Sequence, residues 1–126
     1  MVRRALLRAL SAVGVSALVG AGCLSPTLPI PPPDPPDSMH ATAAGHWQVA
    51  GDCTPGARVT VLDARTGRGA VVEDLTRAGR YVVDLEAEAC DPAWVMQEVD
   101  EERSGQTGFV IGARSRNAPV DAGACP

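Results

Sequence analysis

The sequence predicts an all-β fold, a single small β-sandwich. From Gly45 onward, short runs rich in valine alternate apolar and polar positions, as strands with one buried face do. Glycine interrupts these runs about every ten residues, which is typical of turns between antiparallel strands. About six such strands fit into roughly 70 residues, and this number suits two packed antiparallel sheets.

Three of the predicted strands lie in the first half of this domain. Their apolar residues are Trp47 and Val49, then Val59 and Val61, then Val71 and Val72. Turn-forming sequences separate these strands, namely Gly-Asp-Cys-Thr-Pro-Gly at 51–56 and Ala-Arg-Thr-Gly-Arg-Gly at 64–69. The second of these turns predicts a β-hairpin.

The other three predicted strands follow the turn Arg-Ala-Gly-Arg at 77–80. In the first of them, Tyr81, Val83 and Leu85 share one face, because side chains alternate along a strand. The sequence Cys-Asp-Pro at 90–92 ends this strand. The last two strands are predicted at 94–99 and 109–111. A charged loop is predicted between them, at residues 100–105.

The N-terminal segment has the pattern of an export signal. Its positive region is formed by Arg3, Arg4 and Arg8. Residues 9–21 are almost all apolar or small, and this run is shorter than the roughly 20 residues that a membrane-spanning helix needs. We therefore predict that residues 1–22 are a signal peptide.

The residues around Cys23 resemble the lipobox of bacterial lipoproteins. The sequence Val-Gly-Ala-Gly-Cys at 19–23 carries this resemblance, although Gly20 stands where a large aliphatic residue is usual. The resemblance implies that Cys23 is acylated and becomes the first mature residue, while an ordinary secretory cleavage would leave it a free thiol. Because Leu24 and not an aspartate follows, similarity to Gram-negative lipoproteins implies the outer membrane.

A proline-rich segment separates Cys23 from the predicted domain. Residues 25–38 contain seven prolines, which lack the N–H groups that helices and sheets require. We expect an extended tether, spanning roughly 40 Å if it adopts polyproline II geometry. We therefore predict four segments. They are a signal peptide (1–22), a lipidated cysteine with a disordered linker (23–44), a sandwich (45–114) and a C-terminal tail (115–126).

The charge of the mature chain excludes nucleic acid as a partner. Removing the signal leaves eight arginines against 15 acidic residues, and nucleic-acid affinity comes largely from basic side chains that neutralise phosphates. No polybasic stretch is available to bind anionic lipid. Membrane attachment would therefore depend on the acyl chains at Cys23.

Three further cysteines predict a disulfide bond, since an exported protein matures where such bonds persist. We expect the pair Cys53 and Cys90, which would leave Cys125 free or paired with another chain. Strand alternation leaves an alternative open, because it places Cys53 and Cys90 at opposite ends of a simple meander. Cys125 could then reach Cys90.

Residues 45–114 resemble bacterial Ig-like repeats. The segment Val49–Val61 is similar to their opening, a V-x-G strand followed by P-G-A-x-V-x-V. Gly-Arg-Tyr at 79–81 and the stretch 97–104 resemble later parts, although Glu-Glu-Arg at 101–103 departs from the family's usual Ala-Gly-Asn. The resemblance implies an Ig-like β-sandwich, and carboxypeptidase regulatory-like domains share much of the pattern.

The sequence offers little catalytic chemistry, and we predict neither an enzyme nor a cofactor. His40 and His46 lack the paired spacing of metal sites, and no phosphate loop, metalloprotease motif or nucleophile elbow is present. The acidic residues considered as calcium ligands are Asp63, Asp74, Asp100, Glu101 and Glu102, but none has the spacing of a known calcium loop. If one aromatic side chain is exposed to bind a ligand, we expect Trp47.

These observations predict a lipid-anchored lipoprotein of the cell envelope, held to membrane lipid through acylated Cys23. Its Ig-like domain would bind or place another envelope protein or a glycan without catalysing a reaction. Two alternatives remain at this stage, a small metal-dependent enzyme accessory and a surface glycan-binding module.

Overall fold

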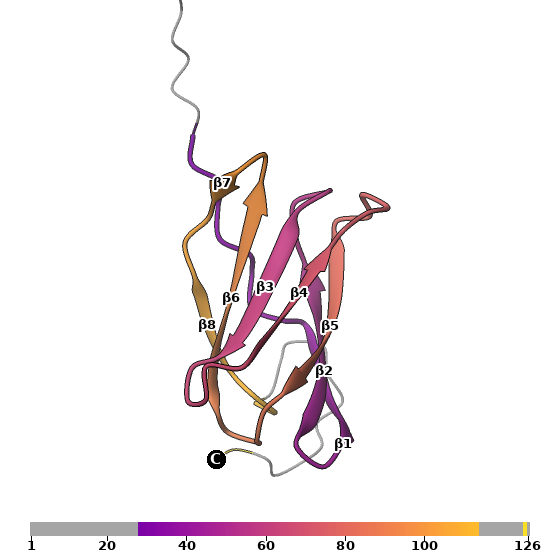
Figure 1. The fold of residues 1–126 in the computed structure, drawn as a ribbon, viewed down its shortest axis with the longest axis vertical. Helices are drawn as coiled ribbons and strands as arrows, with labels where there is room; N and C mark the ends of the chain where they lie inside the picture. The colour runs from indigo at the N-terminus through magenta and orange to yellow at the C-terminus, as the bar shows by residue number, and fades with distance from the viewer. Residues whose placement is uncertain (1–27, 114–124, 126) are drawn as a thin grey trace, which may run out of the picture.

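Two antiparallel sheets pack against each other in the computed structural model, which describes residues 28–113 and Cys125 (Figure 1). Sheet A has the strand order β1-β2-β5, with bounds Ser38–Ala43, His46–Asp52 and Arg80–Glu86. Sheet B has the order β4-β3-β6-β7, with bounds Gly69–Glu73, Arg58–Asp63, Pro92–Val99 and Glu102–Arg103. A further strand, β8 (Thr107–Val110), also pairs with β6. The all-β sandwich predicted from the sequence is therefore confirmed.

The core forms because four strands bury every second side chain. β2, β3, β5 and β6 each alternate buried with more exposed positions, as the apolar alternation in the sequence predicts. The buried residues of the core are Trp47, Val49, Ala57, Val59, Val61, Tyr81, Val83, Leu85, Ala87, Ala93, Val95 and Ile111. Valine dominates this set, and β-branched side chains pack well on a pleated surface.

The sandwich begins earlier than the sequence predicts. Residues 38–43, which were expected to belong to the linker, form β1 and pair with β2 from Ser38 opposite Ala50 to Ala43 opposite His46. The run Ser-Met-His-Ala-Thr-Ala contains no valine, and as an edge strand it buries little of its surface. The predicted linker boundary at residue 44 is therefore wrong. β7 was also missed, because a strand of two residues leaves no periodic signal.

Gly51 and Tyr81 form a close cross-strand pair in sheet A. A Cβ atom at Gly51 would lie 2.7 Å from the Tyr81 hydroxyl oxygen, so only glycine leaves room for the ring. The hydroxyl is buried and has no hydrogen-bond partner among the described residues, and burial raises the pKa of Tyr81. The ring therefore fills the core, while its hydroxyl contributes a desolvation penalty.

Replacing Tyr81 with phenylalanine is expected to raise the free energy of unfolding by about 1 kcal/mol, because an unpartnered hydroxyl is removed from the core. Urea unfolding followed by tryptophan fluorescence measures the change. Tyr81→Leu is the control, and it should lower stability because it removes the ring. A loss of stability in Tyr81→Phe would show that the hydroxyl has a partner in the folded protein and would contradict this assignment.

Candidate functional site

The proline-rich segment lies against the sandwich. We call residues 28–37 the proline strap. The Gln97 side chain donates a hydrogen bond of 2.7 Å from Nε2 to the Pro31 carbonyl, and the Thr107 hydroxyl donates to the Pro33 carbonyl. Pro33 and Pro36 are buried. The segment is extended, as the prolines predict, but these described residues are docked on the domain and do not form a free tether.

The strap passes from sheet B to sheet A. At its end the Asp37 backbone N–H donates to the Ala50 carbonyl at 3.0 Å, which leads directly into β1. The Asp37 carboxylate accepts two hydrogen bonds from the Arg80 guanidinium, at 2.5 and 3.1 Å. This guanidinium also donates to Asp52 at 2.7 Å, and it lowers the pKa of Asp37. The strap thus joins β6 and β8 of sheet B to the start of β1 in sheet A.

Gln97 is the side chain that fixes the strap. It occupies an inward position of β6 and is only 3% exposed. Its Nε2 donates to the strap, while its Oε1 accepts a hydrogen bond of 2.7 Å from the Thr54 backbone N–H. A polar residue at an inward position of a strand needs such partners. That break in the apolar alternation of β6 is the sequence signal that could have indicated the strap.

The hydrogen bonds also define the direction in which the chain leaves the sandwich. Pro33 lies at the level of Thr107, which pairs with Val95, and Pro31 lies at the level of Gln97. Followed toward its N-terminus, the strap therefore runs toward the end of β6 at Val99 (Figure 1). We call this the strap end, and its loops are 53–57, 74–79 and 100–101.

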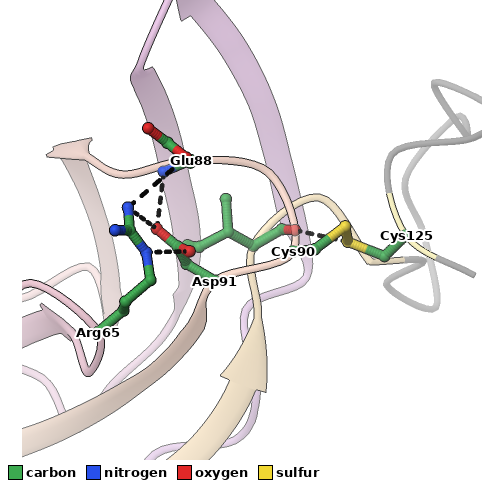
Figure 2. Close-up of a disulfide and its surroundings, with 6 residues drawn as sticks. Arg65, Glu88, Cys90, Asp91 and Cys125 are labelled. Carbon is green, nitrogen blue, oxygen red and sulfur yellow. Dashed lines mark hydrogen bonds and ion pairs between the residues drawn. A yellow bond between two sulfur atoms is a disulfide. The ribbon is translucent and has the colours of Figure 1, made fainter.

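The opposite end carries a disulfide bond between Cys90 and Cys125 (Figure 2). We call it the disulfide end. The Cys90 N–H donates to the Ile111 carbonyl at 2.8 Å, and the Ile111 N–H donates to the Asp91 carbonyl at 2.9 Å. The turn after β5 is thereby joined both to the residue after β8 and to the C-terminal tail.

The predicted bridge between Cys53 and Cys90 is wrong. Cys53 is a free thiol at the strap end, where its N–H donates to the Gly79 carbonyl at 2.9 Å. Cys53 follows the end of β2 and Cys90 follows the end of β5, and these two strands are antiparallel neighbours. The two cysteines therefore lie at opposite ends of the sandwich, as the alternation argument had left open.

A buried carboxylate organises the disulfide end. Asp91 accepts hydrogen bonds from the Arg65 guanidinium at 2.6 and 3.0 Å and from the Glu88 N–H at 3.0 Å. Figure 2 shows Arg65 reaching Asp91 from one side, with the disulfide on the other. The Arg65 guanidinium holds the pKa of Asp91 down to about 2. Because these groups satisfy one another, the cluster joins the 64–68 hairpin to the 87–91 turn.

Trp47 is not an exposed ligand contact. It is 8% exposed and lies in the core, opposite Leu85 of β5. The alternation of β2 places it on the inward face together with Val49. The partly exposed tryptophan is Trp94, on the outer face of sheet B between Leu62 and Gly108.

Several acidic residues considered as calcium ligands are used by the fold. The Asp74 carboxylate accepts hydrogen bonds from the N–H groups of Gly56, Ala78 and Gly79. One oxygen of the fully buried Asp63 accepts from two N–H groups of the following hairpin. Within the described part of the chain, no three His, Cys, Asp or Glu side chains are grouped so that they could hold a metal ion.

Comparison with protein-family models, curated proteins and solved structures finds no match for this chain. Cys23 and the predicted signal peptide precede the described residues, and most of the predicted tail lies outside them as well. Within the part of the chain that is described, no helix is long and apolar enough to cross a membrane.

Gln97→Met should lower the free energy of unfolding by about 2 kcal/mol, because it leaves the Pro31 carbonyl and the Thr54 N–H without their partner. Urea unfolding measures this change. Hydrogen exchange at the Asp37 amide should accelerate, because the strap is released. The matched control is Gln106→Met at an exposed position, which should change stability by less than about 0.5 kcal/mol. Equal effects of the two substitutions would contradict the assigned role of Gln97.

Cys125→Ser should lower the free energy of unfolding by about 2 to 4 kcal/mol, because it removes the bridge to Cys90. Cys53→Ser should change it by no more than about 1 kcal/mol, since that thiol is only partly buried and forms no bridge. Thermal unfolding of both variants under oxidising conditions measures the difference. A larger loss of stability in Cys53→Ser than in Cys125→Ser would contradict the Cys90 to Cys125 bridge and support a bridge between Cys53 and Cys90.

Proposed function

We propose that this protein is a lipid-anchored envelope lipoprotein whose Ig-like β-sandwich acts as a non-catalytic binding or structural module. The observation that carries the proposal is the N-terminal sequence, where a positive region and a short apolar run end at Cys23. In the proposed mature protein, acyl chains on this cysteine hold the molecule at the outer membrane of a Gram-negative cell.

The position of the strap supports this arrangement. It leads the chain out of the sandwich at one end, and Leu28 is separated from Cys23 by only four residues. A fully extended chain between the two would span at most about 18 Å. The sandwich would then stand close to the lipid, with its disulfide end directed away from it.

The chemistry of the described surface supports a module that binds or places other molecules. Five of the six arginines among the described residues are engaged with carboxylates, in pairs such as Arg65 with Asp91 and Arg80 with Asp37. A catalytic site requires polar groups that converge on a pocket while remaining available to a substrate. The partner of the module would be another envelope protein or a glycan.

Cys23→Ala is expected to shift the protein from the membrane fraction to the soluble fraction, because it removes the thiol that would be acylated. Cell fractionation followed by immunoblotting measures the distribution, and Cys53→Ala is the matched control that should stay with the membranes. Membrane association equal to the wild type in Cys23→Ala would contradict lipid anchoring at this residue.

Intact mass of the membrane-extracted protein provides an independent readout. The expected mass is that of residues 23–126 plus the acyl groups, less two hydrogens for the disulfide. A mass that retains residues 1–22 would contradict cleavage. Metal found in stoichiometric amount in the same purified protein would instead favour the metal-dependent accessory.

A further inference from the structure

The turn between β4 and β5, residues 74–79, presents an apolar side chain to solvent. Leu75 is 81% exposed, although leucine is a residue that folded proteins usually bury. It is followed directly by Thr76 and then by the exposed Arg77. A single exposed leucine needs no explanation by itself. Its meaning here comes from the rigidity, charge and position of the turn.

The turn is held rigidly by Asp74. Its carboxylate accepts hydrogen bonds from the Gly79 N–H at 2.7 Å, the Ala78 N–H at 3.0 Å and the Gly56 N–H at 3.1 Å. These backbone donors, with Gly79 the strongest, lower the pKa of Asp74. The Asp74 N–H in turn donates to the Ala57 carbonyl at 2.9 Å. Because the base of the turn is fixed in this way, the outward position of Leu75 is built into the fold.

Arg77 stands apart from the other arginines. Of the six that lie in the described residues, it alone forms no ion pair with a carboxylate. Its φ of 55° is in the left-handed region, which favours glycine. Its guanidinium lies close to Gly56, at the rim of a shallow hollow of about 260 Å³ at the strap end. The turn therefore carries an unpaired cation next to its exposed leucine.

The position of this turn connects it to the anchoring of the chain. The 74–79 turn lies at the strap end, the same end at which the chain leaves toward Cys23. Leu28, at the start of the strap, is 86% exposed. If Cys23 is acylated, the short chain before Leu28 keeps Leu28, which lies at this end, within about 18 Å of the lipid. The exposed Leu75 and Arg77 then belong to the part of the domain nearest the bilayer.

We propose that the 74–79 turn contacts the bilayer surface, with Leu75 inserted among the lipid headgroups and Arg77 paired with lipid phosphate. This inference rests on the proposed acylation of Cys23. An apolar side chain beside a cation matches the layered chemistry of a membrane interface, where phosphate lies above the acyl chains. The contact would make the sandwich stand in one orientation on the lipid.

The acidic residues of the strap end determine which lipids suit this contact. Asp100 and Glu101 are exposed on the neighbouring β6–β7 turn, and Glu73 lines the same hollow as Arg77. They repel a strongly anionic surface, whereas a zwitterionic bilayer offers phosphate groups without a net negative charge. Vesicles of phosphatidylcholine and phosphatidylethanolamine are therefore the appropriate probe.

The test places an environment-sensitive fluorophore at the turn of the lipidated full-length mature protein. A single cysteine replaces Leu75 in a Cys53→Ser background, is labelled with a nitrobenzoxadiazole dye, and the protein is reconstituted into vesicles that contain doxyl-labelled lipid. Thr66→Cys, on the exposed hairpin of the disulfide end, is the matched control. We expect quenching at position 75 to exceed that at position 66 several-fold, with a blue-shifted emission at position 75 alone.

A second measurement leaves Leu75 in place. Deuterium uptake by the amides of residues 75–80 should fall when the lipidated wild type is placed in the vesicles, and Leu75→Ser should abolish this protection. The control Val82→Ser, which changes an exposed apolar residue on the outer face of sheet A, should retain it. Protection that persists in Leu75→Ser would contradict insertion of the leucine.

Flotation of the vesicles on a density gradient separates the two proposals. If the protein floats but the dye at position 75 is as exposed to water as the dye at position 66, the contact proposed here is overturned and lipid anchoring remains intact. Protein that does not float overturns both. Protection of the turn that appears only when a second protein is added would also overturn the contact, and would assign Leu75 to a protein interface.

Discussion

The buried side-chain amide of Gln97 is the interaction on which the arrangement of this protein depends. It connects three segments that are far apart in the sequence: β6, the turn at Thr54 and the strap at Pro31. Its oxygen and its nitrogen each have a partner in the backbone, as a buried polar side chain requires. Because the strap is fixed at this point, the end of the sandwich from which the chain departs is fixed as well.

Proline explains why the strap needs side chains to hold it. A segment with five prolines among residues 31–36 cannot donate the backbone hydrogen bonds of an added strand. It can only accept, so β6 and its neighbour supply donors from the side chains of Gln97 and Thr107. At Asp37 the prolines end, a backbone N–H becomes available, and ordinary strand pairing begins with β1. The strap is thus held by hydrogen bonds from side chains, whereas β1 is held by hydrogen bonds between backbone groups.

The sequence was informative where one face of a strand is buried. The alternation in β2, β3, β5 and β6 predicts both the strands and most of the core, because burial imposes a period of two. β1 could not be predicted in this way, since it buries little and contains no valine. The docking of the strap could not be predicted, because a proline-rich composition indicates an extended backbone but does not indicate which surface that backbone contacts. The separation of Cys53 from Cys90 follows from the antiparallel direction of β2 and β5, and the burial of Trp47 follows from the alternation that puts it on the same face as Val49.

The two ends of the sandwich differ in the side chains that their turns expose. At the disulfide end, Arg65 and Asp91 neutralise each other and the bridge at Cys90 closes the turn. At the strap end, Asp74 is fully used in holding its turn, yet the turn presents Leu75 and the unpaired Arg77 outward. An unpaired cation beside an exposed leucine gains nothing for the isolated domain, because water solvates one and is ordered by the other. Such a combination becomes favourable against a surface that offers phosphate and hydrocarbon together. The end of the sandwich that carries it is therefore the end that we expect to face the lipid.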